Sequence, residues 1–287
     1  MRLNKLTIAL FFAISIIGYS HGAERAPADG GNIYEDFNTL EELERIYQPY
    51  ASNASTHEPM YFLVGTDPKK SKFQISFKYR LFNPEGSMWE SHKWLQGLYF
   101  GYTQTSYWDL KSTSAPFEET SYKPELFILT NNFNVLPDFG AKLFLQTGVK
   151  HESNGQAGEE SRSTNYFYFR PIYVKPYFKR GGGIYIAPKL QLFFINDDTN
   201  KDIDEYRGNF ELDISAGYLY GLVASAKIAL AEKGVSGFVD FTYPLSSLLD
   251  DNLDLYFHVQ YVNALAEGLR DYRGREEALR IGLSFVR

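Results

Sequence analysis

Three hydrogen-bonding residues lie close together in the segment 150–169: His151, Ser153 and Asn165. These residue types can perform nucleophilic catalysis, in which a serine attacks, a histidine removes its proton, and a third group holds the imidazole in the required tautomer. An asparagine carbonyl fills the third role without adding charge. That suits a surface of low dielectric constant, where an unpaired carboxylate is costly. The alternative interpretation is ordinary polar surface near a loop, which is what a His-x-Ser pair usually is.

The spacing of these residues places them on one face of predicted β-strands, because successive side chains of a strand alternate between its faces. In the strand expected over 140–153, His151 and Ser153 fall on the apolar row and Glu152 on the polar one. Asn165 falls on the row of the next strand that also carries phenylalanines. Polar groups on a lipid-facing surface are expensive and usually functional, which favours the catalytic interpretation.

Apolar and polar residues alternate along most of the chain after residue 57. The stretches SKFQISFKYRL and NLDLYFHVQYV follow this period of two closely, as expected for strands between lipid and water. We expect strands near 58–66, 72–84, 95–108, 122–135, 140–153, 163–179, 182–197, 206–219, 221–233, 234–246, 252–264 and 276–287. Because the count is even and several strands are long, the predicted fold is all-β, a twelve-stranded antiparallel transmembrane β-barrel. In the alternative, a soluble lipocalin-like barrel, the apolar face would point inward.

The N-terminal region has the pattern of a secretory signal peptide. Two basic residues precede an apolar run, and small residues stand before an expected cleavage site. We therefore expect a signal peptide over 1–22, a periplasmic leader over 23–57 and the barrel over 58–287. The leader contains one short helical pattern, capped at residues 38–39.

Composition favours a membrane barrel and excludes other classes. The chain has 22 Tyr and 23 Phe, and aromatic residues make up 17% of it, more than a usual cytosolic enzyme needs; girdles at two membrane interfaces would use them. There is no cysteine, which excludes a disulfide scaffold and a thiolate nucleophile. The net charge of −6 argues against nucleic acid as a partner, which would require a basic surface.

The segment HESNGQAGEESRSTN closely resembles the active-site segment of the bacterial outer-membrane phospholipase A family. The family pattern is His-acidic-Ser-Asn-Gly, a short loop, then Ser-Arg-Ser, one residue and Asn, and the loop length agrees. The upstream stretch GYTQTSYWDLKSTSAPFEETSYKPELF is similar to the family's preceding strand and loop. The resemblance implies a twelve-stranded outer-membrane barrel that hydrolyses acyl esters of phospholipids and lysophospholipids as a reversible homodimer with bound calcium.

The resemblance also implies roles for individual residues. Ser153 would be the nucleophile, His151 the base, Asn165 the orienting residue, and the N–H of Gly155 one oxyanion donor, with calcium-bound water as the other. The implied calcium ligands are Gln156 and Ser161 from one subunit, Ser114 from the partner subunit, and Asp198 in the monomer. Gln156 replaces the arginine usual in the family.

Gln104 is a candidate for the dimer interface. It shares a row with Phe100, Tyr102 and Ser106, so it would face lipid unsatisfied unless a second chain pairs with it. Two such glutamines meeting in the membrane, which the family also implies, would contribute about 0.6–2 kcal/mol. The alternative is an error of one position in the strand register.

The remaining histidines and the turns carry weaker expectations. His258 falls on a polar row and is expected in the lumen, whereas His57 and His92 are expected in loops. Short turns such as 220–221 and 233–234 are expected at the periplasmic end, and longer loops such as 154–162 outside.

Two functional hypotheses follow. If the first is correct, the active site is expected near the outer leaflet. The first is a calcium-dependent hydrolase that cleaves phospholipid acyl esters in the outer membrane. The second is a non-catalytic outer-membrane barrel, porin-like or structural. Twelve strands leave little open channel once lumen side chains fill it, which counts against a porin.

Overall fold

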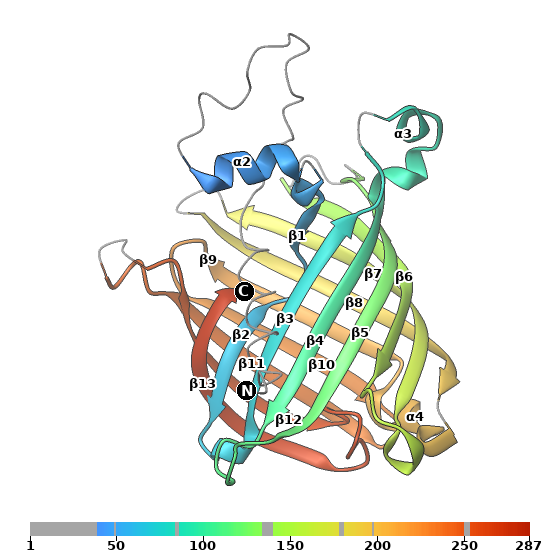
Figure 1. Cartoon of the computed structure of the whole chain (residues 1–287), viewed down its shortest axis with the longest axis vertical. Helices are drawn as coiled ribbons and strands as arrows, with labels where there is room; N and C mark the ends of the chain where they lie inside the picture. The colour runs from blue at the N-terminus through green and yellow to red at the C-terminus, as the bar shows by residue number, and fades with distance from the viewer. Residues whose placement is uncertain are drawn as a thin grey trace.

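The computed structural model describes residues 39–48, 50–83, 86–133, 140–177, 181–196, 198–249 and 253–287, and in these the chain forms a closed antiparallel β-barrel (Figure 1). Each strand pairs with the next along the chain, and the last pairs with the first. The strands of the wall are β2 (Met60–Gly65), β3 (Ser71–Arg80), β4 (Leu98–Trp108), β5 (Phe117–Leu129), β6 (Lys142–Ser153), β7 (Ser163–Tyr177), β8 (Gly182–Asn196), β9 (Phe210–Tyr218), β10 (Val223–Ala231), β11 (Gly234–Pro244), β12 (Tyr256–Leu265) and β13 (Arg275–Val286). The predicted twelve-stranded barrel is confirmed; the expected signal peptide lies outside the described residues.

The first strand of the barrel is short, and a separate segment extends its edge. β2 pairs with β3 only over Tyr61–Leu63, and its pairing with β13 contains a register shift between Ser284 and Val286. Upstream, β1 (Ala54–Thr56) pairs with the other half of β3. The residues between β1 and β2 leave the sheet. Because β1 lies within the expected leader 23–57 and pairs with β3, the end of this leader forms part of the wall.

Short helices lie at both ends of the barrel. α2 (Leu40–Tyr47) is capped by Thr39, whose hydroxyl accepts from the N–H of Glu42 while the Glu42 carboxylate accepts from the N–H of Thr39. The other short helices are η1 (Ala51–Asn53), η2 (Pro68–Lys70), α3 (Ser87–Ser91), η3 (Lys93–Gly97), η5 (Gly158–Glu160), η6 (Asp198–Asn200) and α4 (Ile203–Arg207). No helix of the described residues is long and apolar enough to cross a membrane.

The alternating strand directions divide the connections between two ends. α2 and α3 lie at one end, which we call the terminal end, and α4 lies at the other, the loop end (Figure 1). Loop 154–162 and the turn 232–233 both lie at the loop end, whereas the turn 219–222 lies at the terminal end. The expectation that both short turns share one end is therefore wrong, because a single strand, β10, separates them and reverses the chain.

The two faces of the wall differ sharply in chemistry. Outward side chains are apolar and exposed, for example Leu126 43%, Val149 43%, Phe167 44%, Leu192 63% and Ile281 43%. Inward positions hold buried polar residues, among them Lys72, Glu125, Gln146, Glu152, Gln191, His258, Gln260 and Arg280. This arrangement is that of a transmembrane barrel and the reverse of a soluble one, so the lipocalin-like alternative is excluded.

Hydrogen-bonded ion pairs fill the lumen. His258, buried as expected, lies 2.7 Å from the Asp240 carboxylate. His57 lies in the connection between β1 and β2, so its expected loop position is confirmed. This connection turns inward, where Nε2 of His57 lies 2.8 Å from Oε1 of Glu125 and the ring stacks on Phe127 at 5.0 Å between centroids.

Candidate active site

The three candidate catalytic residues lie at the loop end of two neighbouring strands. His151 and Ser153 lie at the C-terminal end of β6, and Asn165 lies near the start of β7. His151 is paired directly with Asn165, and Ser153 with Ser163, across the two strands. Glu152, between the first two, is 3% exposed and points into the lumen. The outward direction predicted for the three side chains therefore agrees with the strand geometry.

The imidazole and the amide are in hydrogen-bond contact. Nδ1 of His151 lies 2.9 Å from Oδ1 of Asn165. Because an amide oxygen accepts, Nδ1 carries the proton and Nε2 is left with its lone pair. Within the described residues, the Ser153 hydroxyl has no hydrogen bond to the ring. Such bonds are often long in unliganded enzymes and shorten when substrate binds.

A buried asparagine shapes the loop that follows Ser153. Asn154 is 2% exposed, and its Oδ1 accepts from the N–H groups of Gln156 at 3.2 Å and Arg162 at 3.1 Å. Its Nδ2 donates to the carbonyl of Glu160 at 2.8 Å. One side chain thereby fixes both ends of the loop. This role of Asn154 was not predicted, although Asn followed by Gly is itself a turn signal.

Gly155 has the geometry of a hydrogen-bond donor open to a ligand. Its φ is +68°, and a Cβ at this position would lie 2.8 Å from Cε2 of Tyr122, so both the backbone and the space require glycine. Tyr122 in turn is paired with Ser153 across β5 and β6. Within the described residues the N–H of Gly155 donates to no acceptor, whereas the N–H groups of Asn154 and Gln156 are both engaged.

The implied calcium ligands lie on three loops at the loop end. The carbonyl of Ser161 accepts from the Arg162 guanidinium at 2.8 Å and from the hydroxyl of Thr199. Asp198, the residue before Thr199, is exposed and lies 2.9 Å from the Lys201 amine. The β8–β9 connection therefore brings Asp198 into the neighbourhood of Ser161.

Gln156 and Ser114, the other two implied calcium ligands, make no such contact with the Ser161 region within the described part of one chain. Gln156 is exposed in loop 154–162. Ser114 lies in the β4–β5 loop at a φ of 69°, and no hydrogen bond of the described residues joins its side chain to Gln156 or Ser161. Nor do the described residues contain a group of three or more His, Cys, Asp or Glu side chains able to hold a metal. A cation at this position would have to be held largely by carbonyl and hydroxyl oxygens.

Gln104 is on the outward row of β4 as expected, but it is not unsatisfied. Its Oε1 accepts from the Tyr102 hydroxyl at 3.1 Å, and its Nε2 donates to Oγ of Ser106 at 3.4 Å. The expectation that it lacks a partner in one chain is therefore wrong. The pattern of residues i−2 and i+2 on the same face could have revealed both partners.

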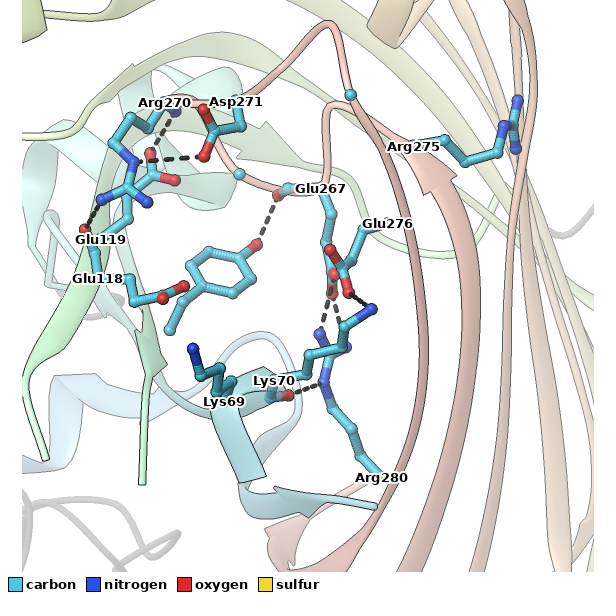
Figure 2. Close-up of a pocket in the computed structure, with 13 residues that line it drawn as sticks. Lys69, Lys70, Glu118, Glu119, Glu267, Arg270, Asp271, Arg275, Glu276 and Arg280 are labelled. Atoms are coloured by element: carbon cyan, nitrogen blue, oxygen red, sulfur yellow. Dashed lines mark hydrogen bonds and ion pairs between the residues drawn. The ribbon is translucent and has the colours of Figure 1, made fainter. Parts of the chain in front are cut away.

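A cavity of about 140 Å³ lies at the loop end, lined by residues of the β2–β3 and β12–β13 connections and of strands β4, β5 and β13 (Figure 2). Ion pairs cross its lining, including Arg280 with Glu267 at 2.8 Å and Lys70 with Glu276 at 2.7 Å. The Tyr107 hydroxyl donates to the carbonyl of Glu267 at 2.5 Å. These contacts tie the β12–β13 loop across the mouth, which counts against the porin-like alternative.

The closed barrel with an apolar outer face is the fold of outer-membrane β-barrel proteins. Residues 39–285 match the family model described as phospholipase A1, so the chain belongs to the phospholipase A1 family. A phospholipase A1 of Proteus vulgaris is 31% identical over 63% of this chain and 60% of its own length. A Neisseria meningitidis protein provisionally named phospholipase A1 is 25% identical, covering 94% of this chain and 76% of that protein.

Two solved structures have the same fold. The outer membrane phospholipase A of Escherichia coli is 23% identical, with a TM-score of 0.64 over 80% of this chain and 92% of that one. The outer membrane phospholipase of Salmonella typhi, crystallised as a dimer with bound calcium, is 22% identical, with a TM-score of 0.65 over 80% of this chain and 91% of that one.

Proposed function

We propose that this phospholipase hydrolyses acyl ester bonds of phospholipids and lysophospholipids in the outer membrane, with Ser153, His151 and Asn165 as its catalytic residues. The observation that carries the proposal is the 2.9 Å contact between Nδ1 of His151 and Oδ1 of Asn165 on the outer face, on the same row as Ser153. A hydrogen-bonded His–Asn pair next to a serine on a lipid-facing surface is costly without a function.

The chemistry follows from the positions of these groups. Nε2 of His151 accepts the proton of the Ser153 hydroxyl as Oγ attacks the ester carbonyl, and Asn165 keeps the imidazole in the tautomer that allows this. The N–H of Gly155 donates to the developing oxyanion. Expulsion of the alcohol product takes the proton back from the imidazole and leaves an acyl-serine. Water, deprotonated by His151, then releases the fatty acid and restores the serine.

The surroundings of the site fit a lipid substrate. Val149 and Phe167, on the same outward rows as His151 and Asn165, are 43% and 44% exposed. Acyl chains in a bilayer can lie against these side chains while the ester reaches the end of the strands. A lipid in the outer leaflet, on the side of the long loops, would therefore meet the site without leaving the membrane.

Calcium fits the oxygen-rich loop beside the site. The carbonyls of Glu159 and Ser161 both accept from the Arg162 guanidinium, at 2.7 and 2.8 Å, so this loop already gathers a positive charge. Calcium prefers oxygen ligands, including main-chain carbonyls and waters. We propose that Gln156 and Ser161 hold it together with Ser114 of a second copy in the dimer, and that Asp198 is a ligand in the monomer. When bound, calcium would supply a polarised water as the second oxyanion donor.

We further propose that the active form is a reversible homodimer. The supporting observation is the half-buried outward polar strip of Gln104 and Tyr102, whose mutual hydrogen bond can be exchanged for bonds to a second copy. Tyr122 is paired with Gln104 on one side and Ser153 on the other, so this strip is continuous with the site. A partner seated there would complete the substrate cleft.

The decisive test replaces the nucleophile. Ser153→Ala should abolish the release of fatty acid from detergent-dispersed phospholipid in the presence of calcium, by a factor of about 10⁴ or more. Ser225→Ala is a matched control, since Ser225 bonds to Ser215 on the opposite part of the wall and should retain wild-type activity. Full activity of the Ser153 variant, with folding verified, rejects the proposed mechanism.

A further inference from the structure

The end of β6 that carries His151 and Ser153 has a buried carboxylate on its opposite face. Glu152 is 3% exposed, and both of its oxygens accept hydrogen bonds from the guanidinium of Arg207. The Lys123 amine lies 3.8 Å from the same carboxylate. Opposite charges therefore meet inside the barrel, directly behind the outward histidine and serine.

Arg207 is itself held in a packed structure. It ends α4, and a second nitrogen of its guanidinium donates to the carbonyl of Ala266 at 3.2 Å. Ile203 of α4 is fully buried against the β12–β13 loop, in a cluster with Ala266, Leu269, Tyr272 and Tyr206. We call α4 together with loop 266–274 the cap. Packing within the cap therefore fixes the position from which Arg207 contacts Glu152.

The β8–β9 connection that contains α4 also holds the other strand of the site. Asn200 is fully buried, its Oδ1 accepts from the N–H of Ser163 at 3.1 Å, and its Nδ2 donates to the carbonyl of Ser163 at 3.0 Å. Ser163 is the residue paired with Ser153 at the end of the β6–β7 ladder. The β8–β9 connection therefore contacts β6 through the bond of Arg207 to Glu152 and β7 through the bonds of Asn200 to Ser163.

We propose that Arg207 and Asn200 are positioning residues that hold the ends of β6 and β7 in register, and so align Ser153 with the imidazole. This inference rests on the proposed function, since it assumes that Ser153 and His151 react. Neither positioning residue makes a hydrogen bond to His151, Ser153 or Asn165. Their effect is transmitted through the backbone of the two strands.

The physical need for this support comes from the location of the site. Ser153 and Ser163 form the terminal pair of the ladder, beyond which the chain enters loop 154–162. Strand ends fray more readily than strand centres because fewer contacts hold them. Since a displacement of about 1 Å in a catalytic group can cost about 100-fold in rate, a brace on the inner side maintains reactivity on the outer side.

The test removes both charges of the pair together, so that no unpaired charge is left in the lumen. Glu152→Gln combined with Arg207→Gln should fold into a barrel with the heat-modifiable gel migration of the wild type. Its kcat should fall by about 10–100-fold while KM changes by less than about twofold, because alignment and not substrate binding is lost. Covalent labelling of Ser153 by a sulfonyl fluoride should slow by a similar factor.

A matched pair provides the control. Lys189 and Glu211 lie 2.8 Å apart on inward positions of β8 and β9, with side chains 16% and 12% exposed. Replacing both with glutamine removes an equivalent partly buried ion pair that does not contact the end of β6. Its effect on thermal unfolding should be comparable, with kcat and the labelling rate close to those of the wild type.

Arg207→Lys keeps the charge but loses the two-nitrogen contact, and should give a kcat between those of the wild type and the double variant. It also covers the case in which the double variant does not fold. Unchanged kcat and labelling in both folded variants, or losses equal to those of the control pair, overturn the inference. So does a rise in KM at constant kcat.

The same experiment distinguishes this inference from the proposed function. The proposed function fails if Ser153→Ala remains active. The inference fails if Ser153→Ala is inactive, as expected, while the variants of the Arg207 pair react with the sulfonyl fluoride at the wild-type rate.

Discussion

The two faces at the end of β6 lie one residue apart and are built in opposite ways. On the outer face, a contact of 2.9 Å joins Nδ1 of His151 to Oδ1 of Asn165. On the inner face, Glu152 is engaged by Arg207 and lies near Lys123. The groups proposed to react are thus sparsely bonded, while the groups directly behind them are densely bonded.

This difference indicates a division of labour within one strand. A reactive serine and imidazole need free hydrogen-bonding capacity, so they cannot be fixed by many bonds of their own. The alternation of a β-strand allows the neighbouring residue to be anchored on the other side of the wall. Contacts that fix Glu152 in the lumen can therefore also hold His151 and Ser153 in place at the lipid surface.

The largest of the remaining expected effects comes from breaking the contact between His151 and Asn165. Asn165→Ala leaves Nδ1 of His151 without its acceptor at a half-buried site, which should cost about 1–3 kcal/mol, or about 10–100-fold in kcat. KM should change little, since Asn165 contacts the imidazole and not the substrate. Steady-state kinetics on detergent-dispersed phospholipid measure both constants. A variant with normal kcat would show that the outer contact is dispensable.

A smaller effect is expected at the calcium loop. Arg162→Gln removes the guanidinium from the carbonyls of Glu159 and Ser161, so a bound cation would meet less repulsion. Exposed charge pairs are typically worth about 0.2–1 kcal/mol, which predicts that calcium binds about 1.4–5-fold more tightly. Calorimetric titration of the detergent-solubilised protein with calcium chloride measures this directly. Weaker binding would mean that Arg162 organises the loop more than it competes with the cation.

The smallest expected effect is a loss of stability of the cap at low pH. Hydrogen bonds from Arg273 and Tyr272 lower the pKa of Asp202 to about 2. An unfolded aspartate titrates near pKa ~3.9, so the folded pKa is the lower one. The resulting stabilisation is present above about pH 4 and is lost as the pH falls toward about 2. Hydrogen exchange of the Gly274 amide, which donates to the carbonyl of Asp271 in the same loop, should accelerate over this interval.

Asp202→Asn provides the control for the acid experiment, because the acceleration of Gly274 exchange between about pH 4 and 2 should be smaller in this variant. Burial and the same hydrogen bond raise the pKa of Tyr272 to about 12, so the tyrosine remains a neutral donor throughout. An unchanged acid dependence in the Asp202 variant would locate the responsible group elsewhere.

The alternating pattern was enough to predict the barrel, the outward row of His151 and Ser153, and the lumen position of His258. It could not predict the contacts between distant segments. Arg207 meets Glu152 across 55 positions of sequence, and His57 meets Glu125 across 68. Local spacing carries no information about such pairs, because they depend on how far each loop folds back over the mouth.

Strand boundaries were predicted less well where the ladder is irregular. β5 begins at Phe117, five residues before the expected start at 122, because a bulge between Tyr107 and Trp108 lets the pairing with β4 continue past Glu119. The partners of Gln104 were missed for a different reason. A glutamine on a lipid face was treated as isolated, although its same-row neighbours Tyr102 and Ser106 can satisfy it.

The closure of the wall between β2 and β13 has a consequence for biogenesis. β2 and β13 are far apart in sequence but form this junction, so the sheet keeps two open edges until these two strands meet. Open edges invite pairing with other polypeptides, and short edge strands are one protection against it. With six residues, β2 offers little template for such association. A short β2 thus limits the association of an unclosed barrel with other polypeptides.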